Sequence, residues 1–343
     1  MHLRKSANKM ESSIAYRRYS LPFRAIVLTA HGPWAMREGL YVRIDKAGGG
    51  VGFGEASPVP HFGKESVGAG EAFLASLGGR VAPDILSRVP GGLSSLRGAL
   101  ACALGDDAGP PRHDSMAVAA LLPAGRAALR GAPEKVQAGF RIFKWKVAVG
   151  DACDEMAILD DLMGILPAGS RVRLDANGGW DTRTAGRWLD HASGLPVEFV
   201  EQPVAAGSRG GDDALMGLAA DYPVPVALDE SVACDADAAR WLDAGWKGYF
   251  VIKAALLGDA AGTLGRLAQA GARVVFSSAL ETGIGARCAL RAAFAWPGER
   301  AALGFGVWPL FANSRFDGPA AAPFLRHEDV ERMNSEALWN AVS

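Results

Sequence analysis

The sequence is poor in cysteine and has almost no net charge. Its four cysteines are scattered without a CxxC pair, which argues against structural zinc or a disulfide framework and fits a reducing cytoplasm. A formal net charge of −1 provides no basic field for nucleic acid or an anionic membrane. The first twenty residues hold no apolar core of signal-peptide length, and no run approaches a membrane span. We therefore expect a cytoplasmic protein with a small-molecule partner; nothing in the sequence indicates its oligomeric state.

From residue 113 the sequence repeats one pattern of short apolar strand, polar loop and amphipathic helix. The strands are nearly continuous apolar runs, as in parallel sheets that are covered on both faces. Alternating strands and helices predict an α/β fold, a (β/α)8-type barrel over residues 113–306. The eight candidate strands are 116–122, 141–149, 171–177, 197–203, 224–230, 249–256, 273–280 and 302–307.

Residues 1–112 follow a different pattern. Two apolar segments flank the turn "KAGGG" at 46–50 and read as antiparallel strands, while 65–81 and 99–105 read as helices. This order predicts an α+β domain ahead of the barrel. The tail, 307–343, is irregular, and we expect it to pack back on the α+β domain.

Charged residues interrupt five successive barrel strands near their carboxyl ends, at steps of 24 to 29 residues, which is about one βα unit. In a barrel these positions converge on one pocket. Three carboxylates from adjacent strands would repel one another unless a cation joined them, and oxygen ligands favour Mg²⁺, with Mn²⁺ as the alternative. Alternatively, each acid caps the helix that follows it, as Asp181 and Asp235 are expected to do. The five residues are Lys146, Asp175, Glu201, Asp229 and Lys253.

The stretch "FKWKV" places Lys144 and Lys146 on one face of a strand, with the tryptophan on the other. Two lysines side by side indicate either a basic catalyst or an edge strand turned to water. In "RVRLDAN", the same alternation puts Arg173, Asp175 and Asn177 on one face. Because Arg173 lies deeper than Asp175, we expect it to form a buried ion pair; contact with a substrate is the alternative.

In chain order, the motifs "KWK", "LDANGGW", "EFVEQP", "ALDES" and "VIKAALLG" resemble those of the enolase superfamily, within its muconate-lactonizing-enzyme subgroup. The resemblance spans essentially the whole chain and implies a modified TIM barrel with an N-terminal capping domain that the C-terminal tail completes. It implies that Mg²⁺ is bound by three acids, that Lys146 removes a proton α to a carboxylate, and that Lys253 lies on the opposite face of the substrate. The implied metal ligands are Asp175, Glu201 and Asp229, and the implied supporting residues are Lys144, Asn177 and Glu230.

Other subgroups of the superfamily carry a catalytic histidine on the seventh barrel strand. The six histidines here, at positions 2, 31, 61, 113, 191 and 327, miss that strand, which favours the subgroup with paired lysines. The segments "YRRYSLPF" and "GFGEASPVPHFGKES" resemble the capping domains of o-succinylbenzoate synthases. That resemblance implies a carbon–oxygen lyase of menaquinone or phylloquinone biosynthesis. Such an enzyme dehydrates 2-succinyl-6-hydroxy-2,4-cyclohexadiene-1-carboxylate to 2-succinylbenzoate through an ene-diolate intermediate.

Two further segments are candidates for substrate contact. His61 and Phe62 would line the substrate pocket, or their segment is an ordinary turn rich in proline and glycine. Ser277 and Ser278 would bind a substrate carboxylate, or they cap the next helix. Two rival functions also stay open. An N-acylamino acid racemase or muconate-type cycloisomerase would use the same scaffold, because racemisation needs two opposed lysines. A non-catalytic ligand-binding barrel is the other, although the intact lysines and acids argue against it.

Overall fold

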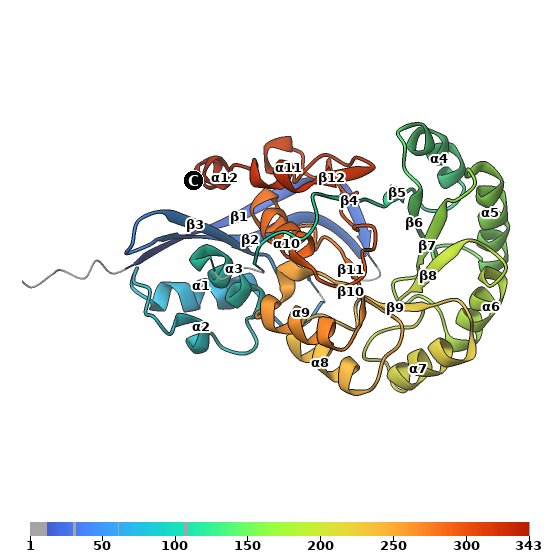
Figure 1. The fold of residues 1–343 in the computed structure, drawn as a ribbon, viewed down its shortest axis with the longest axis horizontal. Coiled ribbons are helices and arrows are strands. Elements are labelled where there is room, and N and C mark those ends of the chain that lie inside the picture. The colour runs from blue at the N-terminus through green and yellow to red at the C-terminus, as the bar shows by residue number, and fades with distance from the viewer. Residues whose placement is uncertain (1–11, 30–31, 61, 106–108, 343) are drawn as a thin grey trace, which may run out of the picture.

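The computed structural model describes residues 12–29, 32–60, 62–105 and 109–342 of the chain. Figure 1 shows an antiparallel sheet with its helices on one side of the molecule and a barrel ringed by helices on the other. This arrangement confirms the predicted fold class, a barrel with an N-terminal α+β capping domain. Among the described residues, no helix combines the length and the apolar character that a membrane span needs.

The capping domain is built on a three-stranded antiparallel sheet with β2 at its centre. Along β2, Leu40, Val42 and Ile44 pack against the helices, whereas Tyr41 packs on the opposite face. This alternation is the period of two of a strand that is buried on both sides. The elements are β1 (Ser13–Thr29), β2 (Gly32–Asp45), β3 (Val51–Ala56), α1 (Val67–Ser76), α2 (Ile85–Arg88) and α3 (Ser94–Leu104).

The turn between β2 and β3 lies where the sequence predicted it. The backbone N–H of Lys46 donates to the carbonyl of Gly50 at 3.0 Å, and the N–H of Gly49 donates back to Lys46 at 2.8 Å. Gly49 and Gly50 have φ values of +90° and +86°, which side chains with a Cβ rarely adopt. The glycines therefore permit the tight reversal that joins the two strands.

The barrel is a curled sheet of seven parallel strands in the order β11-β10-β9-β8-β7-β6-β5. Figure 1 shows helices α4 to α9 packed around its outside. The strands are β5 (Ala120–Leu122), β6 (Ile142–Lys146), β7 (Arg171–Asp175), β8 (Val197–Glu201), β9 (Val226–Leu228), β10 (Tyr249–Ile252) and β11 (Arg273–Phe276). The helices are α4 (Ala127–Gln137), α5 (Ala152–Ile165), α6 (Thr182–Ala192), α7 (Gly211–Asp221), α8 (Asp235–Asp243), η1 (Ala254–Leu256), α9 (Ala260–Gln269) and α10 (Gly283–Ala295).

Two predicted barrel strands differ in detail. The first is divided, because β4 (Ser115–Ala117) leaves the barrel to pair with a tail strand, β12 (Phe324–Arg326), and only β5 pairs with β6. The eighth, 302–307, makes only isolated parallel bridges, from Leu303 to Val118 and from Gly304 to Ser277. A Cβ on Gly304 would lie 2.7 Å from the Ser277 hydroxyl. This segment therefore closes the barrel by close backbone contact and not as a regular strand.

The tail packs against the face of the capping sheet that its helices leave open. Tyr19 and Tyr41 from the sheet form one apolar cluster with Phe311 and Trp339 from the tail. Arg17 of β1 donates to the Trp339 carbonyl at 2.6 Å, and Figure 1 shows the C-terminus beside this sheet. The tail elements are η2 (Ser314–Phe316), β12, α11 (His327–Glu331) and α12 (Ser335–Ala341). The domain limits at residues 112 and 306 stay predictions.

Of the two expected helix caps, one is confirmed. Asp181 caps α6 by accepting a hydrogen bond from the Thr184 N–H at 2.6 Å. The prediction for Asp235 was wrong, because the N-cap of α8 is Cys234. The Asp235 carboxylate instead accepts hydrogen bonds from the Gly258 N–H at 2.7 Å and the Asp259 N–H at 3.0 Å. It thus ties α8 to the loop before α9, a contact between elements that local sequence does not report.

Glu55 of β3 joins the capping sheet to the barrel at the start of α10. Its carboxylate accepts hydrogen bonds from the backbone N–H groups of Thr282 at 2.9 Å and Gly285 at 2.8 Å, and from the Tyr19 hydroxyl at 2.6 Å. The first N–H groups of a helix have no partner within the helix, and its amino end favours negative charge. A buried carboxylate from the capping domain therefore caps a barrel helix.

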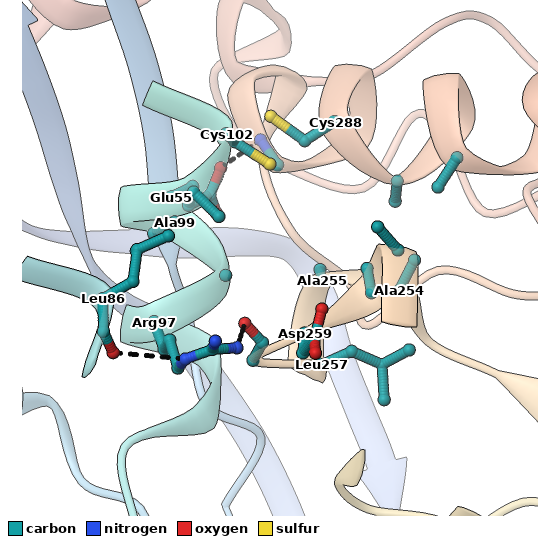
Figure 2. Close-up of a pocket in the computed structure, with 18 residues that line it drawn as sticks. Glu55, Leu86, Arg97, Ala99, Cys102, Ala254, Ala255, Leu257, Asp259 and Cys288 are labelled. Carbon is teal, nitrogen blue, oxygen red and sulfur yellow. Dashed lines mark hydrogen bonds between the residues drawn. The ribbon is translucent and has the colours of Figure 1, made fainter. Parts of the chain in front are cut away.

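Figure 2 shows a second contact between the two parts, where α3 faces η1 and α10 around a small cavity. Arg97 of α3 donates to the carbonyl oxygens of Leu86, at 3.3 Å, and Gly258. The cavity measures about 60 Å³ and is lined mostly by small side chains such as Ala99 and Ala254. That volume accommodates water but no organic substrate. We therefore regard this interface as structural.

Candidate active site

A cavity of about 780 Å³ lies between the carboxyl ends of the barrel strands and the capping domain. Its barrel side carries charged and polar groups, and its capping side carries apolar ones. A pocket of this size and composition suits a small organic acid. The barrel contributes Lys144, Lys146, Asp175, Asn177, Gln202, Asp229, Glu230, Lys253 and Ser278, while the capping side includes Val27, Leu28, Trp34, Val59, Pro60 and Phe62.

The strand register aligns the predicted residues at one end of the sheet. Lys146 at the end of β6 pairs with Asp175 of β7, and Asp175 pairs with Glu201 of β8. Asp229 follows β9 directly, and Lys253 follows β10. The structure therefore brings together all five charged residues that the spacing singled out, with the three acids between the two lysine-bearing strands.

Lys144 bridges two of the three acids. Its ammonium group lies 2.8 Å from the Asp175 carboxylate and 2.6 Å from that of Glu201. Lys253 contacts the third acid, Asp229. Lys146 instead donates to the backbone carbonyl of Leu28, a capping residue, at 3.0 Å. The lysine pair thus faces the pocket, which rules out the alternative of an edge strand in water.

None of the three acids is the N-cap of the helix that follows it. The helices that follow them are capped by Asp181, Gly210 and Cys234. Within the described ranges, no three His, Cys, Asp or Glu side chains are grouped closely enough to enclose a metal ion as they stand. The donors nevertheless fit a hard cation in kind, since they are carboxylates, and a buried oxygen of Glu230, Oε2, has no hydrogen-bond partner. A divalent cation would compete with the lysine ammonium groups for these oxygens.

Burial and neighbouring charges shift the pKa values of four ionisable residues in the site. Burial and the charge of Asp175 raise the pKa of Glu201, and the same two causes raise the pKa of Glu230 to about 7. Burial alone would lower the pKa of Lys144, but Asp175 and Glu201 outweigh it and raise that pKa above its ordinary value. Burial lowers the pKa of Lys253 to about 7 despite the carboxylates around it. Lys144 therefore stays protonated between the two carboxylates that it contacts.

Several residues at the strand ends adopt left-handed backbone conformations. Asn177 has φ +43°, Gln202 has φ +40° and Leu280 has φ +59°. Such conformations cost about 1–3 kcal/mol in residues other than glycine and collect at functional sites. Asn177 matches its supporting role, because its side-chain amide donates to Glu230 at 3.0 Å and its backbone N–H donates to Asp175 at 3.1 Å.

Gln202 is a site residue that sequence reasoning missed. It is fully buried, and its side-chain oxygen accepts hydrogen bonds from the backbone N–H groups of Asp229 at 3.0 Å and Ser231 at 3.2 Å. Its amide donates to the Ser231 hydroxyl at 2.9 Å. Gln202 thereby fixes the backbone that carries Asp229. The available signal was an amide side chain directly after Glu201, at the end of an apolar strand.

The remaining candidates divide between pocket and support. Phe62 lies in the pocket with its ring centroid 4.5 Å from the Lys253 ammonium, and His61 lies outside the described residues. Ser278 lines the pocket, while the Ser277 hydroxyl donates to the Gly304 carbonyl at 3.3 Å. Neither serine caps α10, whose N-cap is Thr282. These placements make Phe62 and Ser278 the candidates for substrate contact.

Arg173 lies below the pocket and does not line it. Its side chain is 1% exposed and pairs with Glu198 at 2.7 Å. Its guanidinium also donates to the Ala302 carbonyl at 2.8 Å, and the guanidinium carbon lies 5.0 Å from the ring centroid of Phe199. The expected buried ion pair is therefore present.

Comparison with known proteins adds independent findings. Residues 127–323 match the family described as enolase C-terminal domain-like. An o-succinylbenzoate synthase from Thermosynechococcus vestitus is 40% identical over 300 residues, which cover 85% of this chain and 91% of that relative.

Two solved structures place these findings in three dimensions. The crystal structure of o-succinylbenzoate synthase from Thermosynechococcus elongatus BP-1, complexed with Mg in the active site, superposes with a TM-score of 0.82. It is 36% identical and covers 96% of this chain and all of that one. An N-succinyl Arg/Lys racemase from Bacillus cereus has a TM-score of 0.78, with coverage of 95% and 98%. At 17% identity, the latter likeness concerns the fold alone.

Proposed function

The chain belongs to the enolase superfamily, and we propose that within it this chain acts as an o-succinylbenzoate synthase. In this reaction, 2-succinyl-6-hydroxy-2,4-cyclohexadiene-1-carboxylate loses water and becomes the aromatic product 2-succinylbenzoate. The observation that carries the proposal is the row of charged groups at the strand ends, in which lysines on β6 and after β10 flank three acids. The relative from Thermosynechococcus vestitus, similar over most of both chains, supports the same reaction.

We assign the metal-binding role to the three acids. Asp175, Glu201 and Asp229 would hold Mg²⁺, with Mn²⁺ as the alternative, because carboxylate oxygens suit both ions. The bound cation would supply Lewis-acid stabilisation of the negative charge that develops on the substrate carboxylate. Asn177 and Glu230 would support this cluster through their mutual hydrogen bond.

Lys146 would act as the base. Its side chain lines the pocket beside Asp175 and carries no carboxylate partner in the described part of the chain. It would take the proton from the ring carbon that bears the carboxylate. The protonated lysine would then give that proton to the departing hydroxyl group, so that the C–O bond breaks, a ring C=C bond forms and water leaves. Because the product ring is aromatic, the elimination is chemically favourable.

Lys253 would serve as the positive charge on the other side of the acids: although burial lowers its pKa to about 7, the carboxylates around it favour its cation. It is buried between Asp229 and the ring of Phe62. A cation held in a pocket from which water is largely excluded stabilises negative charge more strongly than one in water. The apolar capping residues would exclude water from the dihydroarene ring and keep the substrate over the lysines.

A racemase is the second candidate, and the placement of the lysines favours it. Lys146 and Lys253 approach one pocket from strands that three other strands separate. Inversion of a carbon acid needs a proton acceptor on one face and a donor on the other, which this placement permits. The shared fold of the Bacillus cereus racemase fits either reaction.

One experiment separates the two candidates. The purified protein with Mg²⁺ is assayed for aromatic product by absorbance with the dihydroarene substrate, and for loss of optical rotation with N-succinyl amino acids. We expect dehydration to have the higher kcat/KM. Racemisation without aromatic product would reject the synthase assignment, and absence of both activities would favour the ligand-binding barrel.

Metal dependence tests the assignment of the acids. Excess chelator should abolish activity, and added Mg²⁺ should restore it. Replacing any one acid with alanine should abolish activity while the fold, checked by circular dichroism, survives. Full activity in chelator, or in any of these variants, would contradict the assignment; the variants are Asp175→Ala, Glu201→Ala and Asp229→Ala.

A further inference from the structure

Arg37 of β2 is a fully buried cation to which the proposed chemistry assigns no role. In the part of the chain that the structure describes, no carboxylate pairs with its guanidinium. A buried charge without a counter-charge is costly unless hydrogen bonds satisfy it. This raises the question of what holds Arg37 inside the protein.

Five backbone carbonyl groups surround the guanidinium. From Arg37, Nε donates to Leu280 at 3.0 Å, Nη2 donates to Ala279 at 3.2 Å and to Ser57, and Nη1 donates to Pro58 at 2.7 Å. A weaker bond at 3.4 Å reaches the Glu38 carbonyl. The guanidinium also lies 5.1 Å from the ring centroid of Trp34. All five N–H groups of the side chain thus have an acceptor.

Four of these carbonyls belong to two loops that line the active-site pocket. Ser57 and Pro58 begin the capping loop, defined here as 57–60, whose Val59 and Pro60 line the pocket. Ala279 and Leu280 belong to the barrel loop, defined here as 278–281. The two loops are more than 200 residues apart in sequence, and the planar guanidinium of Arg37 joins them by donating hydrogen bonds to both.

The barrel loop needs this support. Leu280 is in the left-handed region at φ +59°, although it is not glycine. Its N–H donates to the Ser278 hydroxyl at 2.9 Å, and the Ser278 hydroxyl donates to Glu281 at 3.1 Å. Arg37 supplies the donors for the carbonyls of the same turn. A strained turn persists only where its surroundings hold it.

We propose that Arg37 is a positioning residue that locks the capping loop to the barrel loop and thereby sets the part of the substrate-pocket wall that these two loops form. If either loop moved away, Arg37 would lose two of its five acceptors and leave part of a buried charge unsatisfied. The two loops therefore open and close together. The kinetic part of this inference rests on the proposed function, whereas the coupling of the loops does not.

The test compares Arg37→Met with Arg97→Met. Arg97 is a matched control, since it also joins capping domain to barrel through backbone carbonyls, at Leu86 and Gly258. It lines the small cavity of Figure 2 and not the active-site pocket. Arg37→Met should raise KM by roughly tenfold or more and change kcat less, because it loosens a binding wall and leaves the lysines in place. Arg97→Met should leave KM within about twofold of wild type. Equal KM effects in both variants would reduce Arg37 to a structural role and overturn the proposal.

Hydrogen exchange gives a readout that is independent of the reaction catalysed. In Arg37→Met, peptides that cover 57–60 and 278–281 should both exchange faster, whereas Arg97→Met should leave them protected. Protection of either loop in Arg37→Met would refute the coupling. If dehydration is absent from the wild type but the exchange result holds, the proposed function fails and the coupling stands.

If Arg37→Met does not fold, the proposal can still be tested with the kinetics of Arg37→Lys and with hydrogen exchange of the wild type. Arg37→Lys keeps the charge but has three donors on one nitrogen, so it cannot reach all five carbonyls. It should therefore reproduce the KM increase, and wild-type kinetics in Arg37→Lys would show that charge alone suffices. If neither variant folds, the wild-type loops should gain protection together when 2-succinylbenzoate is added. Protection of only one loop would then overturn the proposal.

Discussion

Replacing Lys144 with methionine should destabilise the metal-free protein, because Lys144 neutralises two buried carboxylates. Its ammonium lies within 2.8 Å of both Asp175 and Glu201, and the three side chains are 18%, 11% and 2% exposed. Methionine keeps most of the apolar stem but leaves both acids without their cation. Removing one partner of a buried ion pair costs about 3–5 kcal/mol.

That free energy converts into a measurable melting shift. Unfolding entropy is about 2.1 cal/mol/K per residue, or about 0.7 kcal/mol/K for a chain of this length. Lys144→Met should therefore lower the Tm by about 4–7 °C in chelator. Added Mg²⁺ should raise the Tm of Lys144→Met more than that of wild type, because the cation no longer competes with the lysine for the same oxygens.

Differential scanning calorimetry in EDTA and then in excess Mg²⁺ measures both effects. Lys247→Met makes the same chemical change at an exposed site and should leave the Tm nearly unchanged. The double variant Lys144→Met, Glu201→Gln should recover part of the lost Tm, since the neutral amide removes one of the two buried carboxylate charges that Lys144 no longer neutralises. A Tm of Lys144→Met in EDTA equal to that of wild type would refute the stabilising bridge. A smaller Mg²⁺ response than wild type would refute the competition.

Two further predictions concern the lysines and a buried acid. Lys146→Arg should lose roughly 10²–10⁴-fold in dehydration rate, because arginine does not give up its proton. Lys253→Arg should retain measurable dehydration because it keeps the cation. If Lys146→Arg dehydrates normally in the same assay while Lys253→Arg is inactive, Lys253 is the base and not Lys146. Burial raises the pKa of Glu281 from 4.5 to about 7, so the folded state binds this proton more tightly than the unfolded state does. The resulting stability is fully present below pH 4.5 and is lost as pH rises to about 7. Glu281→Gln should flatten the free energy of unfolding, measured with urea, across that range; an unchanged slope would place the titration elsewhere.

The sequence by itself determined the barrel and the residues that meet in it. Apolar strands that recur with amphipathic helices predict parallel strands, and parallel strands end at the same edge of a sheet. A charged residue at the end of each of five strands therefore had to reach the same end of the barrel. Lys146, Asp175 and Glu201 lie in register as this reasoning requires. Periodicity and spacing suffice here because each βα unit repeats the same local geometry.

Tertiary structure alone decided how these groups are connected. From the sequence, Lys144 was a like charge beside Lys146, whereas in the fold it bridges two acids on neighbouring strands. Glu55 caps a barrel helix 227 residues away, and Arg37 reaches a barrel loop 243 residues away. Neither contact has a local signal, because a spacing pattern reports which face a side chain occupies and not which distant backbone group meets it. Hydrogen bonds between distant segments depend on how their surfaces pack, and only the packed structure contains that information.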